Sequence, residues 1–157
     1  MLPEGEYEIT MVGLSAEQAK NLPKGILGIQ RTQNVQELAQ LYSEADILIN
    51  PTYEDNFPTV NIEALACGTP VITYRTGGSP EAIKVDGLGF MVYGNTECYP
   101  TGMVIEQGNV TALANAIMQM KNNPLSSADC RKRAEELFDK DKCFEKYVEL
   151  YEELVKE

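Results

Sequence analysis

Two patterns of apolar residues alternate along the chain. Short continuous runs of apolar, often β-branched residues predict buried strands, and apolar residues spaced three or four apart predict helices with one covered face. The predicted strands are Tyr7–Val12, Ile26–Ile29, Ile47–Ile49, Val71–Thr73, Phe90–Tyr93 and Met103–Ile105. The predicted helices cover residues 15–22, 34–45, 58–67, 109–120 and 129–138, with a helical turn over Pro80–Ile83 and a last helix whose apolar stripe is Phe144, Tyr147, Leu150, Tyr151 and Leu154. This alternation predicts an α/β fold, with a Rossmann-like open parallel sheet flanked by helices.

Capping residues place several of the helix starts. Ser15 is followed three residues later by Gln18, which is the pattern of a capping box, and Asn34 and Asn109 precede the next apolar stripes. The stretch Lys84–Thr101 is rich in glycine and aromatic residues, and it favours an irregular surface hairpin rather than a substrate loop.

Composition narrows the chemistry available to the chain. Its 157 residues fit one domain, and a net charge of −11 disfavours nonspecific binding to nucleic acid or anionic membranes. Histidine is absent, which excludes Ser-His and Cys-His catalysis in this chain. The sequence has no signal peptide and no apolar run of membrane-spanning length. Its four cysteines show no CxxC pair, so we expect reduced thiols, a cytoplasmic location and no metal site.

The segment from Asn50 to Ile72 carries the most specific chemistry. A buried strand leads into a polar loop, and in an open α/β sheet such loops form the ligand-binding edge. Pro58 suits the first position of the next helix, and Asp55 and Asn56 lie where its cap belongs. The free N–H groups that follow at 59–61, together with the helix dipole, would form an anion site.

A second carboxylate follows on the same helix. Helical side chains lean toward the N-terminus, so Glu63 is expected to reach back toward this crevice, where a carboxylate can accept hydrogen bonds from two vicinal hydroxyls. Gly68 would end the helix in a left-handed cap, and Gly77-Gly78 would let the backbone approach a ligand after the next strand.

Taken singly, these residues have ordinary explanations, because a helical Glu is usually solvated and Asp-Asn before a helix is usually a cap. Their combination is more selective. Asp55 and Glu63 are separated by seven residues, and the segments Glu63-Ala-Leu-Ala-Cys-Gly-Thr-Pro-Val-Ile72 and Gly77-Gly-Ser-Pro-Glu81 follow. Together with the helix Glu37–Asp46, this pattern resembles the nucleotide-sugar-binding half of a GT-B glycosyltransferase of the group-1 (GT4-type) family of retaining enzymes.

The resemblance implies glycosyl transfer from a nucleotide-diphosphate sugar with retention, without a metal or another cofactor, in a pathway such as polysaccharide biosynthesis. It implies that Glu63 binds the ribose hydroxyls and that Asp55 holds hydroxyls of the sugar, and these two are the expected catalytic residues. Donor-binding residues would also come from the backbone around the diphosphate, from the glycine pair and from a segment near the base: Asn56, Phe57, Pro58, Thr59, Val60, Gly77, Gly78, Gln30 and Arg31.

The chain departs from the family pattern in ways that matter for function. The family usually has Glu where this chain has Asp55, and Gly where it has Pro58, which removes one N–H donor. The resemblance also implies an N-terminal acceptor domain and a first strand and loop with a basic diphosphate clamp, neither of which is in this sequence. We therefore expect residues 1–157 to be most of a C-terminal donor-binding domain that is inactive alone. The implied architecture also allows peripheral membrane association of the full-length enzyme through the missing part.

Other functions remain open at this point. Asp55 and Pro58 would also fit a noncatalytic nucleotide-sugar-binding or scaffolding module, and donor turnover by the full-length protein would distinguish the two. A nucleotide-sugar epimerase of the same architecture would differ in its product. A flavodoxin-like signalling domain would bind no nucleoside diphosphate.

Overall fold

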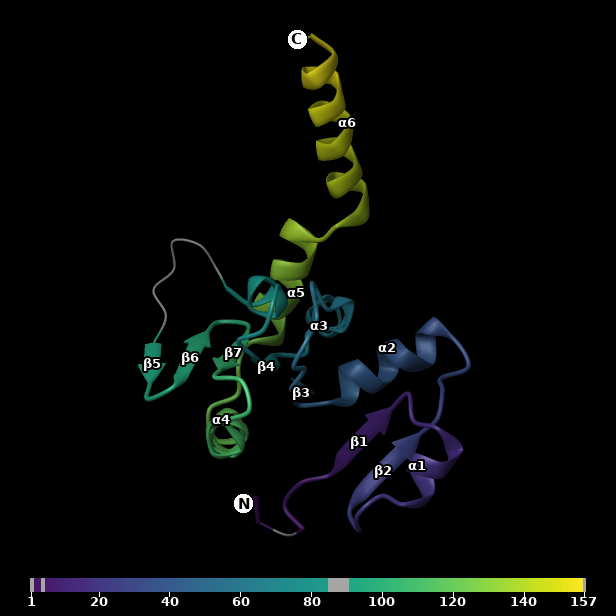
Figure 1. Ribbon diagram of the computed structural model, residues 1–157, viewed down its shortest axis with the longest axis vertical. Helices are drawn as coiled ribbons and strands as arrows, with labels where there is room; N and C mark the ends of the chain where they lie inside the picture. Colours follow the sequence, from purple (N-terminus) through teal and green to yellow (C-terminus); the bar gives the residue numbers. More distant parts are fainter. Residues whose placement is uncertain (1, 4, 85–90, 157) are drawn as a thin grey trace.

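The strands pair into two sheets in the computed structural model, which describes residues 2–3, 5–84 and 91–156. A parallel pair joins β1 (Ile9–Val12) to β2 (Ile26–Ile29). The larger sheet has the order β3-β4-β7-β6-β5 (Figure 1). Its strands are β3 (Leu48–Asn50), β4 (Val71–Tyr74), β5 (Met91–Tyr93), β6 (Thr96–Tyr99) and β7 (Gly102–Ile105). The strands β3, β4 and β7 are parallel, whereas β6 and β5 add an antiparallel edge.

Helices connect the strands in the predicted alternation. They are α1 (Ala16–Lys20), α2 (Val35–Glu44), α3 (Thr59–Ala66), the 3-10 helix η1 (Ser79–Ala82), α4 (Val110–Asn122), α5 (Ser127–Leu137) and α6 (Lys140–Lys156). The capping box at Ser15 and the caps at Asn34 and Asn109 are all present, each side chain accepting a hydrogen bond from a backbone N–H. The α/β class, with a parallel-rich sheet flanked by helices, is therefore confirmed.

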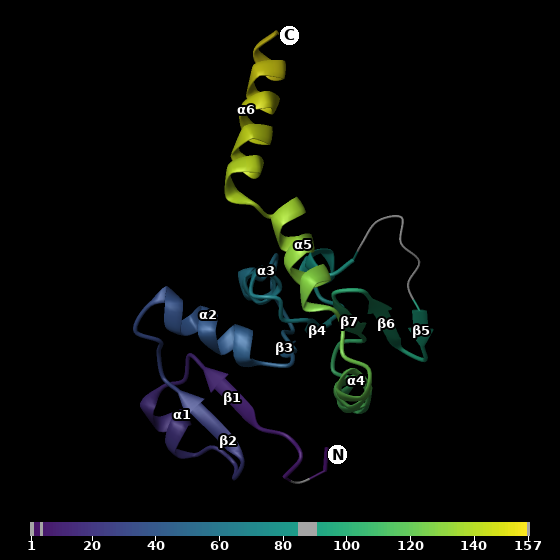
Figure 2. The same cartoon turned by 180° about the vertical axis from the view of Figure 1, so that it is seen from behind.

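The core lies on both faces of β4 and β7. Because side chains alternate along a strand, Val71 packs with α3 and α5, while its neighbour Ile72 packs with α4. Figures 1 and 2 show the same layering, with α3 and α5 on one side of the large sheet and α4 on the other. The central strands thus have covers on both faces, as parallel strands require.

The described part of the glycine- and aromatic-rich stretch, from residue 91 onward, is more regular than predicted. Instead of an irregular hairpin, β5 and β6 form an antiparallel ladder that joins β7. The prediction missed β6 because Thr96–Tyr99 is not an apolar run, and only pairing with β7 makes it a strand. Phe90, predicted as the first residue of β5, lies outside the described residues.

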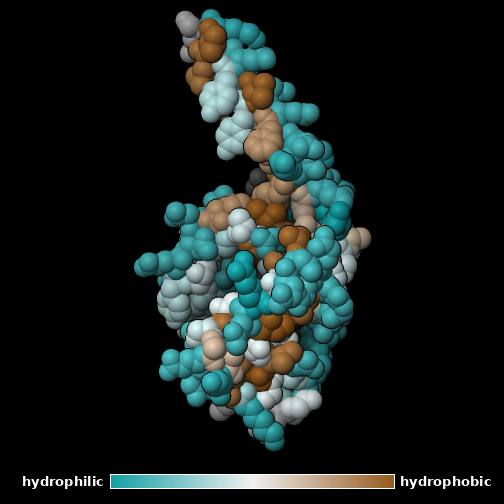
Figure 3. Space-filling model, turned by 90° about the vertical axis from the view of Figure 1, so that its right-hand side faces the viewer, coloured by the Kyte–Doolittle hydropathy of each residue, from teal (hydrophilic) through white to brown (hydrophobic). Residues whose placement is uncertain are grey.

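Two parts of the molecule stand apart from this core. The β1–β2 pair with α1 forms one, and α6 projects from the body as the other (Figures 1 and 3). The predicted apolar stripe of α6 is present but exposed, and Figure 3 shows apolar side chains along the projecting helix. In the part of the chain that the structure describes, no helix has the length and apolar character needed to cross a membrane.

Candidate functional site

Two loops meet at the carboxyl edge of the large sheet, at the ends of the neighbouring parallel strands β3 and β4. The N–H of Gly78 donates a hydrogen bond to the carbonyl oxygen of Asn56 over 2.8 Å. Gly77 has a φ of +47°, and a Cβ at this position would lie 2.0 Å from the carbonyl oxygen of Asp55. The structure therefore brings Asp55, Asn56 and the glycine pair together, and glycine is required here by contact between the two loops.

Aromatic contacts fix the first loop at both ends. The ring of Tyr53 packs edge-on against Tyr74, with ring centroids 5.7 Å apart, and the ring of Phe57 lies 6.0 Å from that of Phe138. The side-chain amide of Gln107 also donates to the carbonyl oxygen of Tyr53 over 2.7 Å. These contacts hold the loop in place, although most of its side chains are exposed.

The start of α3 differs from the prediction. Pro58 is the N-cap rather than the first helical residue, and no side chain caps the helix. The carboxylate of Asp55 instead accepts the N–H of Phe57 over 3.1 Å, and the N–H of Asn61 donates to the carbonyl of Pro58. Asp55 cannot be the cap because it lies three residues before Pro58 and closes a local turn with Phe57. Within the described residues, the hydrogen bonds at this turn include none donated by the N–H groups of Thr59 and Val60, so these two are the donors available to an anion.

The buried side-chain amide of Asn61 joins three elements of the site. Asn61 is fully buried, accepts a hydrogen bond from the side chain of Asn50 over 2.9 Å and donates to the carbonyl of Ser79 over 3.3 Å. It thereby links the end of β3, the start of α3 and η1. Beside the glycine pair, the buried hydroxyl oxygens of Thr76 and Ser79 have no hydrogen-bond partner within the described residues.

Glu63 is half-buried on α3 and faces α2. Its Oε2 accepts a hydrogen bond from the hydroxyl of Tyr42 over 3.0 Å. Burial, and after it the negative charge of Glu63, raises the pKa of Tyr42 well above its usual range, so this hydroxyl stays protonated and donates. The sequence reasoning missed Tyr42, whose only signal was its place in the apolar stripe of α2.

The helix α3 ends as predicted. Gly68 has a φ of +83°, and its N–H donates to the carbonyl of Leu65, while the N–H of Thr69 reaches back to Ala64. These two bonds form the Schellman motif, which satisfies the last carbonyl groups of a helix. The Thr69 hydroxyl also donates to the carbonyl of Tyr42 over 2.5 Å, so the same turn holds the end of α2.

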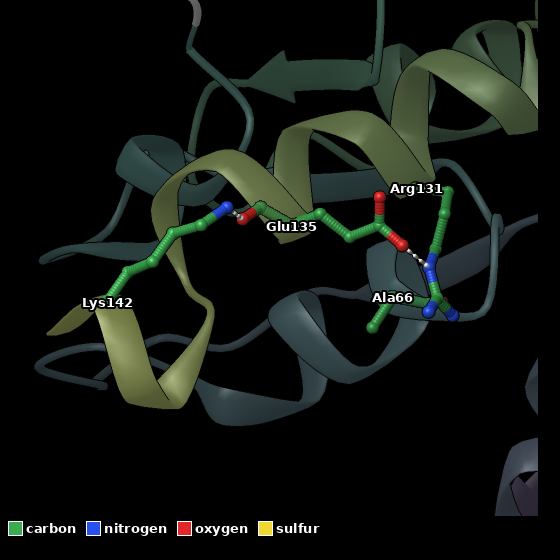
Figure 4. A network of polar contacts seen from close by, with 4 residues as sticks. All are labelled: Ala66, Arg131, Glu135 and Lys142. Carbon is green, nitrogen blue, oxygen red and sulfur yellow. Dashed lines mark hydrogen bonds and ion pairs between the residues drawn. The ribbon is translucent and has the colours of Figure 1, made fainter. Parts of the chain in front are cut away.

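Two arginines of α5 donate hydrogen bonds to backbone carbonyl groups at the ends of α3 and η1. Arg131 donates to the carbonyl of Ala66 over 2.5 Å and to the carboxylate of Glu135 over 2.6 Å, and Lys142 donates to the carbonyl of Glu135 (Figure 4). Arg133 donates to three carbonyl oxygens at the end of η1, those of Glu81, Ala82 and Lys84. Because these guanidinium groups bind the C-terminal carbonyls of α3 and η1, they fix both elements of the site to α5.

The two residues predicted to lie near the base come from the smaller sheet. Gln30 and Arg31 follow β2 and are exposed. In the described part of the chain no hydrogen bond joins them to the Asp55 loop, so their place near a base remains a prediction. Arg75 follows β4 and pairs with Glu97 over 2.7 Å.

No cluster of three or more carboxylate or thiol groups that could hold a metal is found among the described residues.

Comparison with known proteins connects this geometry to a family. The family model described as glycosyl transferases group 1 matches residues 12–137, which include both loops, α3 and β7. A 60-residue stretch is 45% identical to the D-inositol 3-phosphate glycosyltransferase of Corynebacterium jeikeium, covering 38% of this chain and 14% of that protein.

Solved structures show the same likeness over more of the chain. Sucrose-phosphate synthase from Thermosynechococcus elongatus superposes with a TM-score of 0.70 at 28% identity, over 88% of this chain and 32% of that one. HepE from Anabaena, solved in complex with UDP-glucose, shares the fold with a TM-score of 0.62 at 20% identity, over 84% of this chain and 33% of that one. The chain thus spans about a third of the length of these structures. Since the family model covers most of its residues, the chain belongs to the group 1 glycosyltransferase family.

Proposed function

We propose that the protein, at its natural length, transfers a sugar from a nucleotide-diphosphate sugar to an acceptor with retention, without a metal or another cofactor. The observation that carries the proposal is the contact between the Asp55–Asn56 loop and the Gly77–Gly78 turn at the start of α3. It builds a site at the carboxyl edge of the sheet, where ligands of open α/β folds bind. Family membership and the UDP-glucose bound to the HepE structure support it.

Each part of the site has a role in this proposal. Glu63 accepts hydrogen bonds from the ribose hydroxyls, and the free N–H groups of Thr59 and Val60 face the diphosphate at the positive end of α3. Asp55 holds hydroxyls of the transferred sugar. The bond from the anomeric carbon to the phosphate oxygen breaks, and the nucleoside diphosphate leaves with the bonding electrons. The acceptor oxygen bonds to the anomeric carbon, and its proton passes to the departing diphosphate oxygen.

Titration of the natural-length protein with a panel of nucleotide sugars tests the donor site. Glu63→Gln should weaken binding of the best donor about 10- to 100-fold, because one charge-assisted hydrogen-bond acceptor contributes about 1.5–3 kcal/mol. Glu153→Gln is a matched control on the exposed face of α6 and should leave affinity unchanged. Equal affinities for the wild type and Glu63→Gln would remove the ribose role.

Turnover separates this proposal from a noncatalytic nucleotide-sugar-binding or scaffolding module. That alternative is supported by Asp55 and by the buried Pro58, which leaves one N–H fewer at the start of α3. Asp55→Asn should lower turnover or change the sugar preference more than it lowers nucleotide affinity. Donor binding without any sugar transfer by the natural-length protein would favour the noncatalytic module, and the anomeric configuration of the product, read by NMR, tests retention. We expect residues 1–157 alone to bind donor weakly and to transfer no sugar.

A further inference from the structure

Tyr42 is the point at which α2 holds the helix that carries Glu63. Its hydroxyl donates to Oε2 of Glu63 over 3.0 Å, and its carbonyl oxygen accepts the hydroxyl of Thr69 over 2.5 Å. Its ring also packs against the buried cluster that includes Ala64 and Leu65 of α3. Backbone, ring and hydroxyl of one residue are therefore each fixed against α3 or the turn that follows it.

We infer that Tyr42 is a positioning residue for donor binding, whose hydroxyl fixes the carboxylate of Glu63 in the orientation that receives the ribose hydroxyls. The inference rests on the proposed function, in which Glu63 is the ribose acceptor. Tyr42 does not itself touch the donor in this arrangement. It acts by binding one carboxylate oxygen of Glu63 and leaving Oε1 available for the ligand.

The geometry suits orientation rather than charge neutralisation. A free glutamate side chain rotates among several rotamers, and a bond from a fixed donor removes that freedom before the ligand arrives. The phenol is a neutral donor and does not neutralise the carboxylate of Glu63, and in the described residues no cation forms an ion pair with it. An arginine or lysine in this place would compete with the ribose hydroxyls for the same carboxylate.

The protonation state of Tyr42 is consistent with this role. Burial and the adjacent carboxylate both raise the pKa of Tyr42 and disfavour the phenolate, so the hydroxyl remains a donor at neutral pH. The partnership is also non-local, because Glu63 lies 21 positions after Tyr42 in the sequence. Contact between α2 and α3 is what makes it.

The test compares ribose and deoxyribose ligands. The natural-length protein is titrated with UDP, ADP and GDP, and the tightest of these is then compared with its 2′-deoxy counterpart. Tyr42→Phe keeps the ring and its packing but removes the hydroxyl. It should weaken the ribonucleotide about 3- to 10-fold and leave the deoxy ligand less affected, so that the ratio of the two affinities falls. In the double variant with Glu63→Gln, the loss of Tyr42's hydroxyl should have no further effect.

Tyr99→Phe provides the matched control. Tyr99 donates the same kind of hydrogen bond to a carboxylate, that of Glu97 over 2.8 Å, but it pairs with Gly102 at the opposite, amino end of the parallel strands. Both variants lose one hydrogen bond to a carboxylate and should lose a similar, small amount of stability, which thermal unfolding measures. Tyr99→Phe should leave the affinity ratio unchanged.

The outcomes separate the inference from the proposed function. Glu63→Gln should itself lower the ratio of ribonucleotide to deoxynucleotide affinity. If it does so and the ratio is unchanged in Tyr42→Phe, whether both ligands weaken equally or neither weakens, the inference is overturned. A wild type that binds none of the three nucleoside diphosphates, or a Glu63→Gln variant that binds them as the wild type does, overturns the proposed function and the inference with it.

Discussion

The β1–β2 pair and the central strands β4 and β7 come from similar apolar, β-branched runs, and in both regions the strands are parallel. They differ in burial. Every residue of β4 and β7 is buried, whereas every residue of β1 is exposed. Ile72 in β4 has none of its surface in contact with solvent, while 37% of Ile9 in β1 is exposed.

The difference comes from the layers around each sheet. The central strands lie between α3 and α5 on one face and α4 on the other, and antiparallel β6 extends the ladder from β7. Within the described residues, the helix that packs against the β1–β2 pair is α1, which has five residues and none of them buried. A parallel pair needs cover on both faces to become a stable layer, so the same kind of sequence contributes much less to stability there.

Matched isoleucine substitutions should show the largest contrast between the two regions. Ile72→Ala should lower the free energy of unfolding by about 2–5 kcal/mol, because it leaves a cavity in the core. Ile9→Ala should cost less than about 1 kcal/mol, because part of that side chain is already in water. Urea denaturation of both variants measures the difference. If Ile9→Ala were as destabilising as Ile72→Ala, the β1–β2 pair would be packed in solution against something that covers it.

This contrast also marks what local sequence can predict about the fold. Element positions were predicted well because their signals are local: the capping box at Ser15, the cap at Asn109 and the apolar run at Val71 each act within a few residues. Strand pairing is not local. The division into two sheets, and the recruitment of Thr96–Tyr99 by β7, depend on residues far apart in the chain, so the apolar pattern could predict strands but not their partners.

The candidate site divides in the same way. The loop after β3, the helix that follows it and the glycine pair after β4 could be placed at one edge because parallel strands end together. The partners within the site could not be predicted. The bond from Tyr42 to Glu63 and that from Asn50 to Asn61 depend on how helices pack. The cap of α3 was misplaced because Asp55 bonds to Phe57 rather than to the helix.

Two glycines, one from each region, offer a second contrast, with a somewhat smaller expected effect on stability. Gly77 and Gly25 both have positive φ, but a Cβ at Gly77 would meet the Asp55 carbonyl, whereas a Cβ at Gly25, beside β2, would meet nothing within 4 Å. Gly77→Ala should therefore lower the free energy of unfolding by about 2–4 kcal/mol, from backbone strain plus displacement of the Asp55 loop, and it should weaken donor binding.

Gly25→Ala measures the cost of backbone strain at positive φ without any contact to a neighbouring loop. It should lower the free energy of unfolding by about 1–2 kcal/mol and leave donor affinity unchanged. Urea denaturation and donor titration of both variants provide the two measurements. Donor affinity in Gly77→Ala equal to that of the wild type would mean that contact between the two loops does not shape the donor site.

The smallest effect is expected from Glu97, a carboxylate on β6 in the antiparallel part of the large sheet. Burial by itself would raise the pKa of Glu97, but hydrogen bonds from Arg75 and Tyr99 and the positive charges of Arg75 and Lys84 outweigh it and lower the pKa below that of an ordinary glutamate. Glu6, in the segment before β1, pairs with Lys121 over 2.6 Å, but both side chains of that pair are largely exposed. The two glutamates therefore extend the comparison of the two regions to charge.

Replacement of Glu97 by Gln should lower the free energy of unfolding by about 1 kcal/mol at pH 7, since Arg75 remains half-exposed and water screens part of the interaction. Because the folded protein binds the proton at Glu97 less readily than the unfolded chain does, this contribution is complete above the ordinary glutamate pKa and is lost as the pH falls through the lowered value. Urea denaturation from pH 7 to pH 3 should thus show the wild type converging on Glu97→Gln in acid. Glu6→Gln should change stability by less than about 0.5 kcal/mol. A difference between Glu97→Gln and the wild type that persisted undiminished at pH 3 would show that Glu97 acts through packing and not through its charge.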